Sequence, residues 1–515
     1  MLKRFFLPIL ILVLGSFTSF VRAQDSDSTD VETDIPDPIE TKSPKTLGEQ
    51  INEYLNKYNA GAIWGVKVVD LSNGEVLYER NAHRALTPAS NMKLYTTATA
   101  LDVLGADYQY QTDLYYKGSI EDGTLKGDLF IRGSGDPTLG GQFEDEDNDV
   151  LQVFKEWSEA FRRMGIRSVT GNVIGDDDVF DDLARGEAWN ASDFNNCYAA
   201  EISGLAYTEN CMEFTVEGTS AGRRPSITVR PGDTRYVNVV NNGQTVGRGF
   251  GGGVGHPYFS NNYTFSVRIA PSRKYVGTMP IHNPTLYAAT VLQETLTQNG
   301  VNISGQPMDV DSLAEKPSYR GWDMRRIATA YSPALSEITK VINKQSHNMY
   351  AEHLLKTLGA NTSWDGVPRP GSSTRGARVV RDFLRRIGAS TEEIIIVDGS
   401  GLSKINKVTA ATTVRLLEYM WNHKDPQVRT AFYNSLSIAG VDGTLRKRMK
   451  SYPTLGNVHA KTGYVGGVRS LSGYVTTTAG TTVAFSLIAN NFETSRAYVT
   501  RLQDNIVGLI AKYQH

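Results

Sequence analysis

Ser90 and Lys93 are the first residues of the chain whose types and spacing suit nucleophilic catalysis. They form the pattern Ser-x-x-Lys, and the sequence predicts a helix over 90–104, entered through Pro88. Because residues three apart share one face of a helix, the Lys93 amine can reach the Ser90 hydroxyl. The helix N-terminus also offers backbone N–H groups to a developing oxyanion. We therefore expect Ser90 to be an acylating nucleophile and Lys93 to be its base.

Two further short patterns, far along the chain, supply partners for this pair. Ser346-His347-Asn348 lies in a stretch predicted as one helix over 336–358, and Lys461-Thr462-Gly463 lies on a predicted strand. Each pattern alone is weak, because a solvated helix face or a charge at a strand end explains it equally well. Together, Ser-x-x-Lys, Ser-x-Asn and Lys-Thr-Gly are the set of penicillin-binding proteins and β-lactamases. Their order, and the kind of element on which each falls, favour this interpretation.

A sheet assembled from both ends of the chain would bring the three patterns together. A helix over 47–58 is followed by a predicted hairpin, with strands over 63–70 and 75–80 and a type I′ turn at Asn73-Gly74. Strands over 458–462, 465–477 and 482–490 and a helix over 495–513 end the chain. Further helices are predicted over 286–299, 373–387 and 409–423. Strands at both ends with helices between them predict an α/β (α+β) fold with an antiparallel sheet.

The middle of the chain has a different character. From about 108 to 282, runs such as YQYQTDLYY and TLKGDLFIRG are rich in aromatic and β-branched residues and are separated by glycine-containing turns. One helix is predicted there, over 150–164. The sequence therefore predicts a mainly β insertion, 113–282, between two parts of one domain, 46–112 and 283–515.

The first 45 residues indicate export. Residues 1–23 read as a secretory signal, whose apolar run is shorter than the roughly 20 residues that span a bilayer. We expect cleavage after Ala23 and no stable membrane span afterwards. Residues 24–45, with seven acidic residues and two lysines, are predicted to be a disordered tether.

Charge and cysteine content limit the partners. The chain has 53 Lys and Arg against 55 Asp and Glu, so loss of the signal's three basic residues leaves 50 against 55. The tether alone supplies this charge of −5, so the folded body is near neutral and lacks a nucleic-acid footprint. No Cys/His spacing suggests a metal, and no cofactor is expected. Cys197 and Cys211, the two cysteines of the chain, can form a disulfide after export, with two buried free thiols as the alternative.

With these motifs in place, the sequence resembles the class C low-molecular-mass penicillin-binding proteins, the D-alanyl-D-alanine carboxypeptidase/endopeptidases. The resemblance covers nearly the whole mature chain. It also rests on GSGDPTL (133–139), GDDDVFDD (175–182), SPALSEITKVINKQSHNMYAEHLLK (332–356), DGSGLSKINKVT (398–409) and AGVDGTLRKRM (439–449). It implies a serine β-lactamase/transpeptidase-like domain interrupted by inserted β domains.

The resemblance also implies roles for individual residues. Ser90 is similar to the acylated nucleophile, Lys93 to the base, and Ser346 to the proton shuttle to the leaving amine. The other matching positions bind substrate: Asn348 orients its acyl-side amide, and Lys461 with Thr462 of the Lys461-Thr462-Gly463 pattern binds its terminal carboxylate. The backbone N–H groups of Ser90 and Tyr464 would form the oxyanion hole. Ser400 in DGSGLS does not fit the hydrolase pattern Gly-x-Ser-x-Gly and resembles part of an active-site wall loop.

Two departures and one weaker match bear on substrate choice. The family often has Asp where His347 stands, and usually a small residue where Tyr464 stands, so Tyr464 can narrow the cleft. In similar enzymes a Trp and an Asp of the inserted domain hold the amino end of the diaminopimelate side chain. Trp189 and Asp193 match that pair, with a packed Trp beside a helix cap as the alternative.

The function implied is a penicillin-sensitive serine D,D-carboxypeptidase/D,D-endopeptidase that acts through an acyl-enzyme on Ser90. Its partners would be peptidoglycan stem peptides and β-lactam antibiotics, in the periplasm or outside the cell. One alternative is a β-lactamase, which would require fast deacylation of penicillin. The other is a non-catalytic peptidoglycan-binding scaffold, which would bind cell wall without cleaving it.

Overall fold

A computed structural model describes residues 45–143, 149–232, 234–363 and 366–514. The predicted signal over 1–23, and the tether over 24–45 except its last residue, lie outside the described residues. Within the described ranges, no helix combines the length and apolar character needed to cross a membrane.

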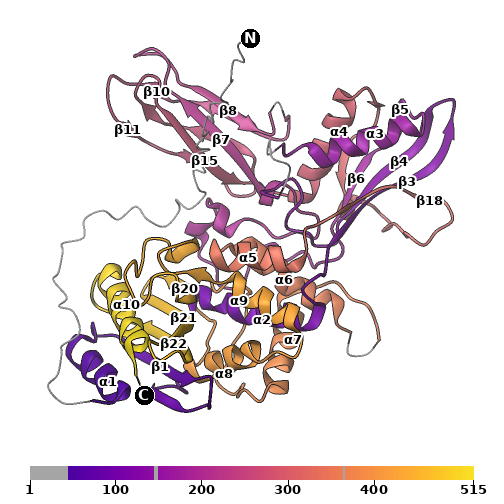
Figure 1. The fold of residues 1–515 in the computed structure, drawn as a ribbon. Coiled ribbons are helices and arrows are strands. Elements are labelled where there is room, and N and C mark those ends of the chain that lie inside the picture. Colours follow the sequence, from indigo (N-terminus) through magenta and orange to yellow (C-terminus); the bar gives the residue numbers. More distant parts are fainter. Residues whose placement is uncertain (1–44, 144–148, 233, 364–365, 515) are drawn as a thin grey trace, which may run out of the picture. The chain divides into compact units, whose positions relative to one another are not determined.

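One antiparallel sheet is built from both ends of the chain, as the sequence predicts (Figure 1). Its order is β19-β20-β21-β22-β1-β2, and every neighbouring pair is antiparallel. The strands are β1 (Ile63–Asp70), β2 (Val76–Arg80), β19 (Ser437–Ile438), β20 (His459–Val465), β21 (Val468–Thr476) and β22 (Thr482–Asn490). The Lys-Thr-Gly pattern therefore lies on β20, near one edge of the sheet.

Helices cover both faces of this sheet (Figure 1). Successive residues of β22 show the alternation, since Phe485 and Leu487 belong to one core and Ala484 and Ile488 to the other. The first core is closed by α1 (Leu47–Tyr58) and α10 (Arg496–Lys512). The second is formed by α2 (Met92–Leu104), α5 (Leu335–Lys344), α6 (Asn348–Asn361), α7 (Ser373–Arg386), α8 (Ala410–Trp421) and α9 (Pro426–Ser435). The Ser-x-x-Lys and Ser-x-Asn patterns thus lie on the α2–α6 side.

The inserted region contains a second, seven-stranded sheet and three small three-stranded sheets. The large sheet consists of β3 (Gln111–Glu121), β4 (Thr124–Arg132), β5 (Ser168–Val169), β6 (Val173–Asp176), β16 (Asn302–Ile303), β17 (Pro307–Asp309) and β18 (Met324–Tyr331). The small sheets consist of β7 (Cys211–Glu217), β8 (Ser226–Arg230) and β15 (Lys274–Pro280); β9 (Asn238–Asn241), β12 (Val254–Gly255) and β13 (Asn262–Phe265); and β10 (Gln244–Thr245), β11 (Phe250–Gly251) and β14 (Arg268–Ile269). The helices α3 (Gln152–Arg163) and α4 (Pro284–Gln298) share the core of this region.

The core of the inserted region continues beyond residue 282, where the sequence predicts the insertion to end. Tyr287 and Leu292 of α4 are fully buried in the same cluster as Leu114 of β3. Strand β18 pairs antiparallel with β3 along its whole length. Because β3 leads the chain into this sheet and β18 leads it out, we propose that the insertion ends near Tyr331.

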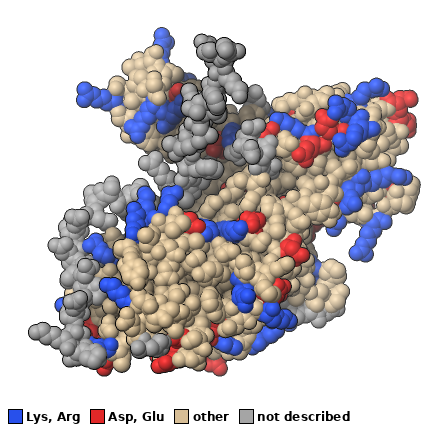
Figure 2. Space-filling model, in the orientation of Figure 1, with Lys and Arg blue, Asp and Glu red and all other residues tan. Residues whose placement is uncertain are grey.

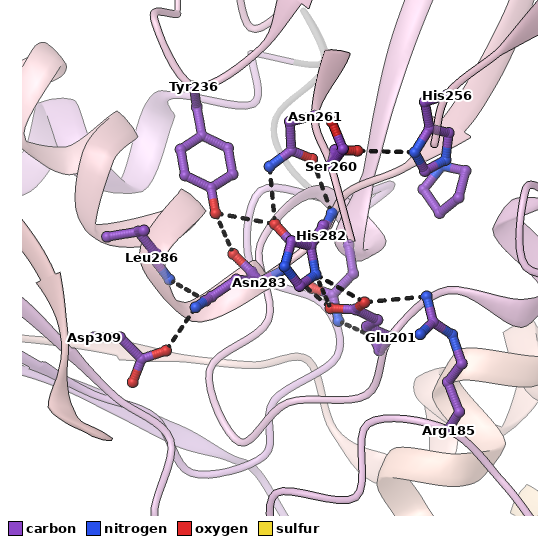
Figure 3. A network of polar contacts seen from close by, with 12 residues as sticks. Arg185, Glu201, Tyr236, His256, Ser260, Asn261, His282, Asn283, Leu286 and Asp309 are labelled. Atoms are coloured by element: carbon purple, nitrogen blue, oxygen red, sulfur yellow. Dashed lines mark hydrogen bonds and ion pairs between the residues drawn. The ribbon is translucent and has the colours of Figure 1, made fainter. Parts of the chain in front are cut away.

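A buried carboxylate ties the corner between β15 and α4 to the segment before β7 (Figure 3). Glu201, 4% exposed, lies 3.0 Å from both Arg185 and the Nδ1 atom of His282, and it accepts a hydrogen bond from the backbone N–H of Asn283. The Asn283 side chain caps α4 by accepting from the N–H of Leu286. These polar contacts add to the apolar packing of Tyr287 in fixing the start of α4.

Charged side chains are spread over the molecular surface. On the face drawn in Figure 2, Lys and Arg (blue) lie in several separate groups, with Asp and Glu (red) near some of them. Proteins that follow a nucleic-acid backbone gather their basic residues in one patch or stripe. The described part of this face carries no such stripe.

The single helix predicted over 336–358 is wrong, because the structure has two helices there. Helix α5 ends at Lys344 and α6 begins at Asn348. Ser346 has a left-handed φ of 61°, and His347 caps α6 by accepting from the N–H of Tyr350. A helix cannot continue through a left-handed residue, so the break lies at the Ser-x-Asn pattern itself.

The type I′ turn predicted at Asn73-Gly74 is also wrong. Of this pair, only Gly74 has a positive φ, whereas a type I′ turn needs two such residues. The Asp70 carboxylate accepts from the N–H of Ser72, and the N–H of Asp70 donates to the carbonyl of Glu75. The side chain of Asp70 therefore shapes a wider loop than the dipeptide alone predicts.

A disulfide joins Cys197 to Cys211 across 14 positions, with their Cα atoms 6.1 Å apart. Cross-linking a loop of this size restricts the unfolded chain, which corresponds to about 3 kcal/mol. We expect the double variant Cys197→Ala/Cys211→Ala to lose about that much free energy of unfolding, measured by urea denaturation. Wild type unfolded under reducing conditions should match the variant, and equal midpoints for oxidised wild type and variant would contradict this expectation.

Candidate active site

Ser90 lies in a 3-10 turn, Ala89–Asn91, that leads directly into α2. Side chains of strand β21 hold this turn against the sheet: Ser470 Oγ donates to the carbonyl of Pro88 at 2.6 Å, and Asn91 Nδ2 donates to Ser472 Oγ at 2.6 Å. The turn also contains a left-handed residue, Ala89, with φ 47°. A non-glycine residue in this conformation persists only where the surroundings fix it, and such residues cluster at functional sites.

Lys93 is fully buried and points at Ser90. Its Nζ atom lies 3.2 Å from Ser90 Oγ, 2.7 Å from Asn348 Oδ1 and 2.8 Å from the carbonyl oxygen of Ser400. Burial lowers the pKa of Lys93 to about 7, although the carboxylates of Glu352 and Asp398 act in the opposite direction. An amine with this pKa is partly neutral near pH 7 and can accept the Ser90 proton.

Ser346 and Lys461 form a second polar pair. Lys461 Nζ donates to Ser346 Oγ at 2.9 Å and to its neighbour's carbonyl, that of Thr462, at 2.8 Å. Burial lowers the pKa of Lys461 well below its usual value, and the charge of Lys93 lowers it further. Because the Ser346 oxygen accepts from Lys461, its own hydroxyl proton is free to point towards a substrate.

Asn348 connects the two halves of the site to the inserted region. Its Oδ1 atom accepts from Lys93, and its Nδ2 atom donates to the carbonyl oxygen of Tyr198 at 2.9 Å. The segment that contains Tyr198 belongs to the insertion and is tethered by the disulfide at Cys197. The insertion therefore contacts the second motif directly.

Gly463 allows strand β20 to approach Ser90. A Cβ atom at this position would lie 2.1 Å from Ser470 Oγ and 3.0 Å from the backbone nitrogen of Ser90, so a larger residue would displace the strand or the turn. Strand β19 pairs only with His459 and Ala460. Within the described ranges, the edge of β20 beyond Ala460 therefore faces no partner strand, and its backbone groups can bind an extended peptide.

Thr462 and Tyr464 point to the face of β20 opposite Lys461, because side chains alternate along a strand. Thr462 Oγ1 donates to Thr444 Oγ1 at 2.8 Å. The Tyr464 ring centre lies 5.1 Å from the guanidinium carbon of Arg469 on β21 and 5.0 Å from that of Arg496 on α10. We expected this side chain to narrow the cleft, but the structure places its ring against these two arginines.

The other predicted substrate pair lies in the wall of the site. Trp189 is 7% exposed, and its indole Nε1 donates to Asp398 Oδ2 at 3.0 Å. Asp193 accepts from the hydroxyl of Tyr198 at 2.8 Å. Trp189 thus lies in the packed wall, whereas Asp193 is only partly buried and borders the residue whose carbonyl binds Asn348.

Glu209 is a site neighbour that sequence reasoning missed. Its carboxylate lies 3.0 Å from His347 Nε2 and accepts from the Tyr350 hydroxyl at 3.2 Å and from Gln142 Nε2 at 3.0 Å. Burial alone would raise the pKa of Glu209, but the adjacent His347 and these hydrogen bonds leave it lowered. Glu209 lies in the inserted region, so a carboxylate from the insertion holds the middle residue of the Ser-x-Asn pattern.

Removing this carboxylate should disturb the second motif. In Glu209→Ala, His347 loses its partner, and we expect acylation to slow about 3- to 10-fold because Ser346 and Asn348 are less well positioned. The rate of labelling by a fluorescent penicillin measures the effect. Glu217→Ala removes a carboxylate of the same region that pairs with Lys274 and not with the motif, and it should stay near the wild-type rate. A Glu209→Ala rate equal to that of wild type would contradict this role.

Comparisons with known proteins identify the family of the chain. The sequence profile described as the D-Ala-D-Ala carboxypeptidase 3 (S13) family matches residues 47–513. The chain belongs to this family. A D-alanyl-D-alanine carboxypeptidase of Actinomadura sp. (strain R39) is 33% identical over 468 residues, 88% of this chain and 82% of that relative. The D-alanyl-D-alanine carboxypeptidase DacB of Haemophilus influenzae is 26% identical over 491 residues, 91% of this chain and 95% of that relative.

A solved structure agrees with this assignment. The crystal structure of penicillin binding protein 4 from Haemophilus influenzae matches with a TM-score of 0.76 and 26% identity, and covers 90% of this chain and 99% of that one. The predicted class C penicillin-binding protein and its mixed fold are therefore confirmed, as is the prediction of a serine peptidase of this family.

Proposed function

We propose that the chain hydrolyses D-Ala-D-Ala and cross-link peptide bonds of peptidoglycan through an acyl-enzyme on Ser90. The observation that carries the proposal is the Ser90–Lys93 pair, 3.2 Å apart, with the pKa of the buried lysine lowered to about 7. A lysine in this state is the activated base that a serine nucleophile needs.

Acylation uses the two lysine–serine pairs in turn. Ser90 Oγ attacks the carbonyl carbon while its proton passes to the neutral amine of Lys93. The tetrahedral oxyanion accepts from the backbone N–H groups of Ser90 and Tyr464. As the C–N bond breaks, the leaving amine takes a proton from Ser346, which Lys461 replaces. Water then attacks the ester and releases the acid and Ser90. The ammonium of Lys93 gives up one proton to solvent and the neutral amine of Lys461 takes one up, so that both lysines return to their starting states.

Substrate binding is assigned to the groups around this pair. The free edge of β20 would hold the acyl side of the peptide as an added strand, and Asn348 would bind its amide. Lys461 would bind the terminal carboxylate of the peptide or of a β-lactam, whereas the Thr462 side chain, on the opposite face of β20, is held by Thr444. Trp189 and Asp193 would border the side chain of the diamino acid, with Asp193 as the group that contacts it, since Trp189 is packed in the wall.

The same proposal covers location and partners. The relatives named D-alanyl-D-alanine carboxypeptidases act on a cell-wall peptide, and the predicted signal over 1–23 would export this chain to the compartment that contains it. β-Lactams, which imitate the terminal dipeptide, would acylate Ser90 as the substrate does. No cofactor has a role in this mechanism.

Digestion of purified sacculi tests the function. The protein should remove terminal D-alanine and convert cross-linked dimers to monomers, both resolved by mass, and prior treatment with penicillin should stop both reactions. Loss of D-alanine without loss of dimers would restrict the activity to carboxypeptidase. Binding to sacculi with neither product would refute the proposal and favour a scaffold, and rapid turnover of penicillin with intact muropeptides would favour a β-lactamase.

A further inference from the structure

We propose that Glu352 is a positioning residue of the acylation reaction, which fixes the 399–400 backbone against Lys93 and supplies negative charge next to the protonated amine. Glu352 lies on α6, one turn after Asn348, and is 2% exposed. The mechanism above does not use this carboxylate. The inference rests on the proposed acylation of Ser90.

The geometry of Glu352 is that of a clamp. One carboxylate oxygen accepts from the N–H of Gly399 at 2.8 Å and the other accepts from the N–H of Ser400 at 2.8 Å. The carbonyl oxygen of the same residue, Ser400, accepts from Lys93 Nζ at 2.8 Å. Glu352 therefore sets the position of one of the two acceptors, Ser400 O and Asn348 Oδ1, that aim the Lys93 amine at Ser90.

The clamp also has an uncharged counterpart on the other side of the same loop. Thr96, one turn after Lys93 on α2, donates through Oγ1 to the carbonyl of Gly399 at 2.8 Å. A neutral hydrogen-bonding group can therefore help to hold the 399–400 backbone in place. A carboxylate at 352 adds something that the threonine cannot, which is charge.

The charged groups around Lys93 come from three elements. Glu352 faces it from α6 and Asp398 from the 398–403 loop, while Lys461 faces it from β20. The Asp398 carboxylate forms hydrogen bonds within its own loop, because it accepts from the N–H groups of Gly401 and Ser403. Burial, together with Asp398, raises the pKa of Glu352 to about 7, so its charge responds to pH in the range where Lys93 works.

The charge of Glu352 matters when Lys93 holds the Ser90 proton. Transfer of that proton creates an ammonium inside the protein, on the side of the site that also holds the Lys461 amine. A carboxylate near the ammonium stabilises this state and makes Lys93 a stronger base. Without it, the amine would remain neutral to lower pH but would accept the serine proton less readily.

The pH profile of acylation by a fluorescent penicillin tests this inference. Acylation by wild type should rise as the pH increases through about 7, as Lys93 becomes neutral. In Glu352→Gln, we expect the rising limb of the pH profile, where the acylation rate increases with pH, to lie about one pH unit lower, because the Lys93 ammonium is less stabilised. We expect the plateau, the maximal acylation rate at high pH, to fall about 10-fold. Penicillin binding before acylation should change little.

Two matched variants separate the effect of the negative charge at position 352 from the effect of the hydrogen bonds that hold the 399–400 backbone. Thr96→Val removes the neutral clamp on the same loop and should leave the limb at its wild-type pH. Glu352→Asp keeps the charge on a shorter side chain, so its limb should stay close to wild type even if the plateau falls. A limb in Glu352→Gln that coincides with wild type would overturn the inference and leave Glu352 as a structural clamp.

Folding and function can be told apart in this experiment. If Glu352→Gln does not fold, Glu352→Leu also removes the charge and carries the same expectation. Failure of both to fold would make Glu352 a requirement of the fold and would overturn the assignment. If wild type is not acylated at any pH, the proposed function fails instead.

Discussion

Ser90→Ala is expected to abolish covalent labelling by a fluorescent penicillin and to lower the rate of D-alanine release by about 10⁶-fold. The hydroxyl is the group proposed to form the acyl-enzyme, and among the described residues Ser90 is the one side-chain hydroxyl hydrogen-bonded to Lys93 Nζ. The change removes one oxygen from a half-buried position. Gel fluorescence and release of free D-alanine measure the two effects.

Ser400→Ala is the matched control for this prediction. Ser400 is the other serine beside Lys93, but it presents its backbone carbonyl, and its hydroxyl accepts from the N–H of Leu402. The control should still be labelled. Labelling that persists in Ser90→Ala and disappears in Ser400→Ala would refute the assignment of the nucleophile, and thermal unfolding of both variants would verify that each is folded.

The secondary structure could be predicted where one signal dominates. Strand β22 is a short, nearly continuous apolar run, as expected for a strand buried on both faces, and α1 keeps an apolar stripe, so both could be predicted. Helix α9 was missed, although Asp425 and Pro426 are a typical helix start: Asp425 caps the N–H of Gln427. The start of α9 is therefore marked in the sequence by Asp425 and Pro426.

Other features depend on contacts that no local pattern contains. The apolar spacing of α5 continues into α6, with Ile338, Ile342 and Met349 all buried, so periodicity predicted one helix through the left-handed Ser346. Packing of α4 against β6 likewise depends on a fold in which residues about 110 positions apart, such as Gly175 and Thr285, meet. Both differences arise because tertiary packing overrides local spacing.

The candidate site divides in the same way. Ser90, Lys93 and the two later motifs could be identified because each is a short pattern of fixed spacing. Glu209 contacts His347 across 138 positions, and Tyr198 contacts Asn348 across 150. No spacing rule joins such residues, and Glu352 was overlooked because a glutamate on a helix is ordinarily solvent-exposed. The supporting groups of the site therefore required the three-dimensional structure.

Lys93→Met should slow acylation by about 10²- to 10⁴-fold, the usual contribution of a general base, while the protein remains folded. Methionine is similar in length to lysine and apolar, so it suits a position with no exposed surface. Stopped-flow acylation over pH 5–9 measures the loss. The steep rise of the wild-type rate through about pH 7, which reflects neutral Lys93, should disappear in the variant.

A second lysine shows whether the effect is specific to the base. Lys344 ends α5, two residues before Ser346, and forms an ion pair with Asp442 rather than with the serines. Lys344→Met removes a cation close to the site and should retain both the acylation rate and its dependence on pH.

If Lys93→Met kept the wild-type rise near pH 7, the titrating base would lie elsewhere, and Lys461, the buried amine next to Ser346, would be the next candidate. If both variants lost activity equally, the loss would come from the removal of positive charge and not from proton transfer, because of these two lysines Lys93 is the one that contacts the Ser90 hydroxyl.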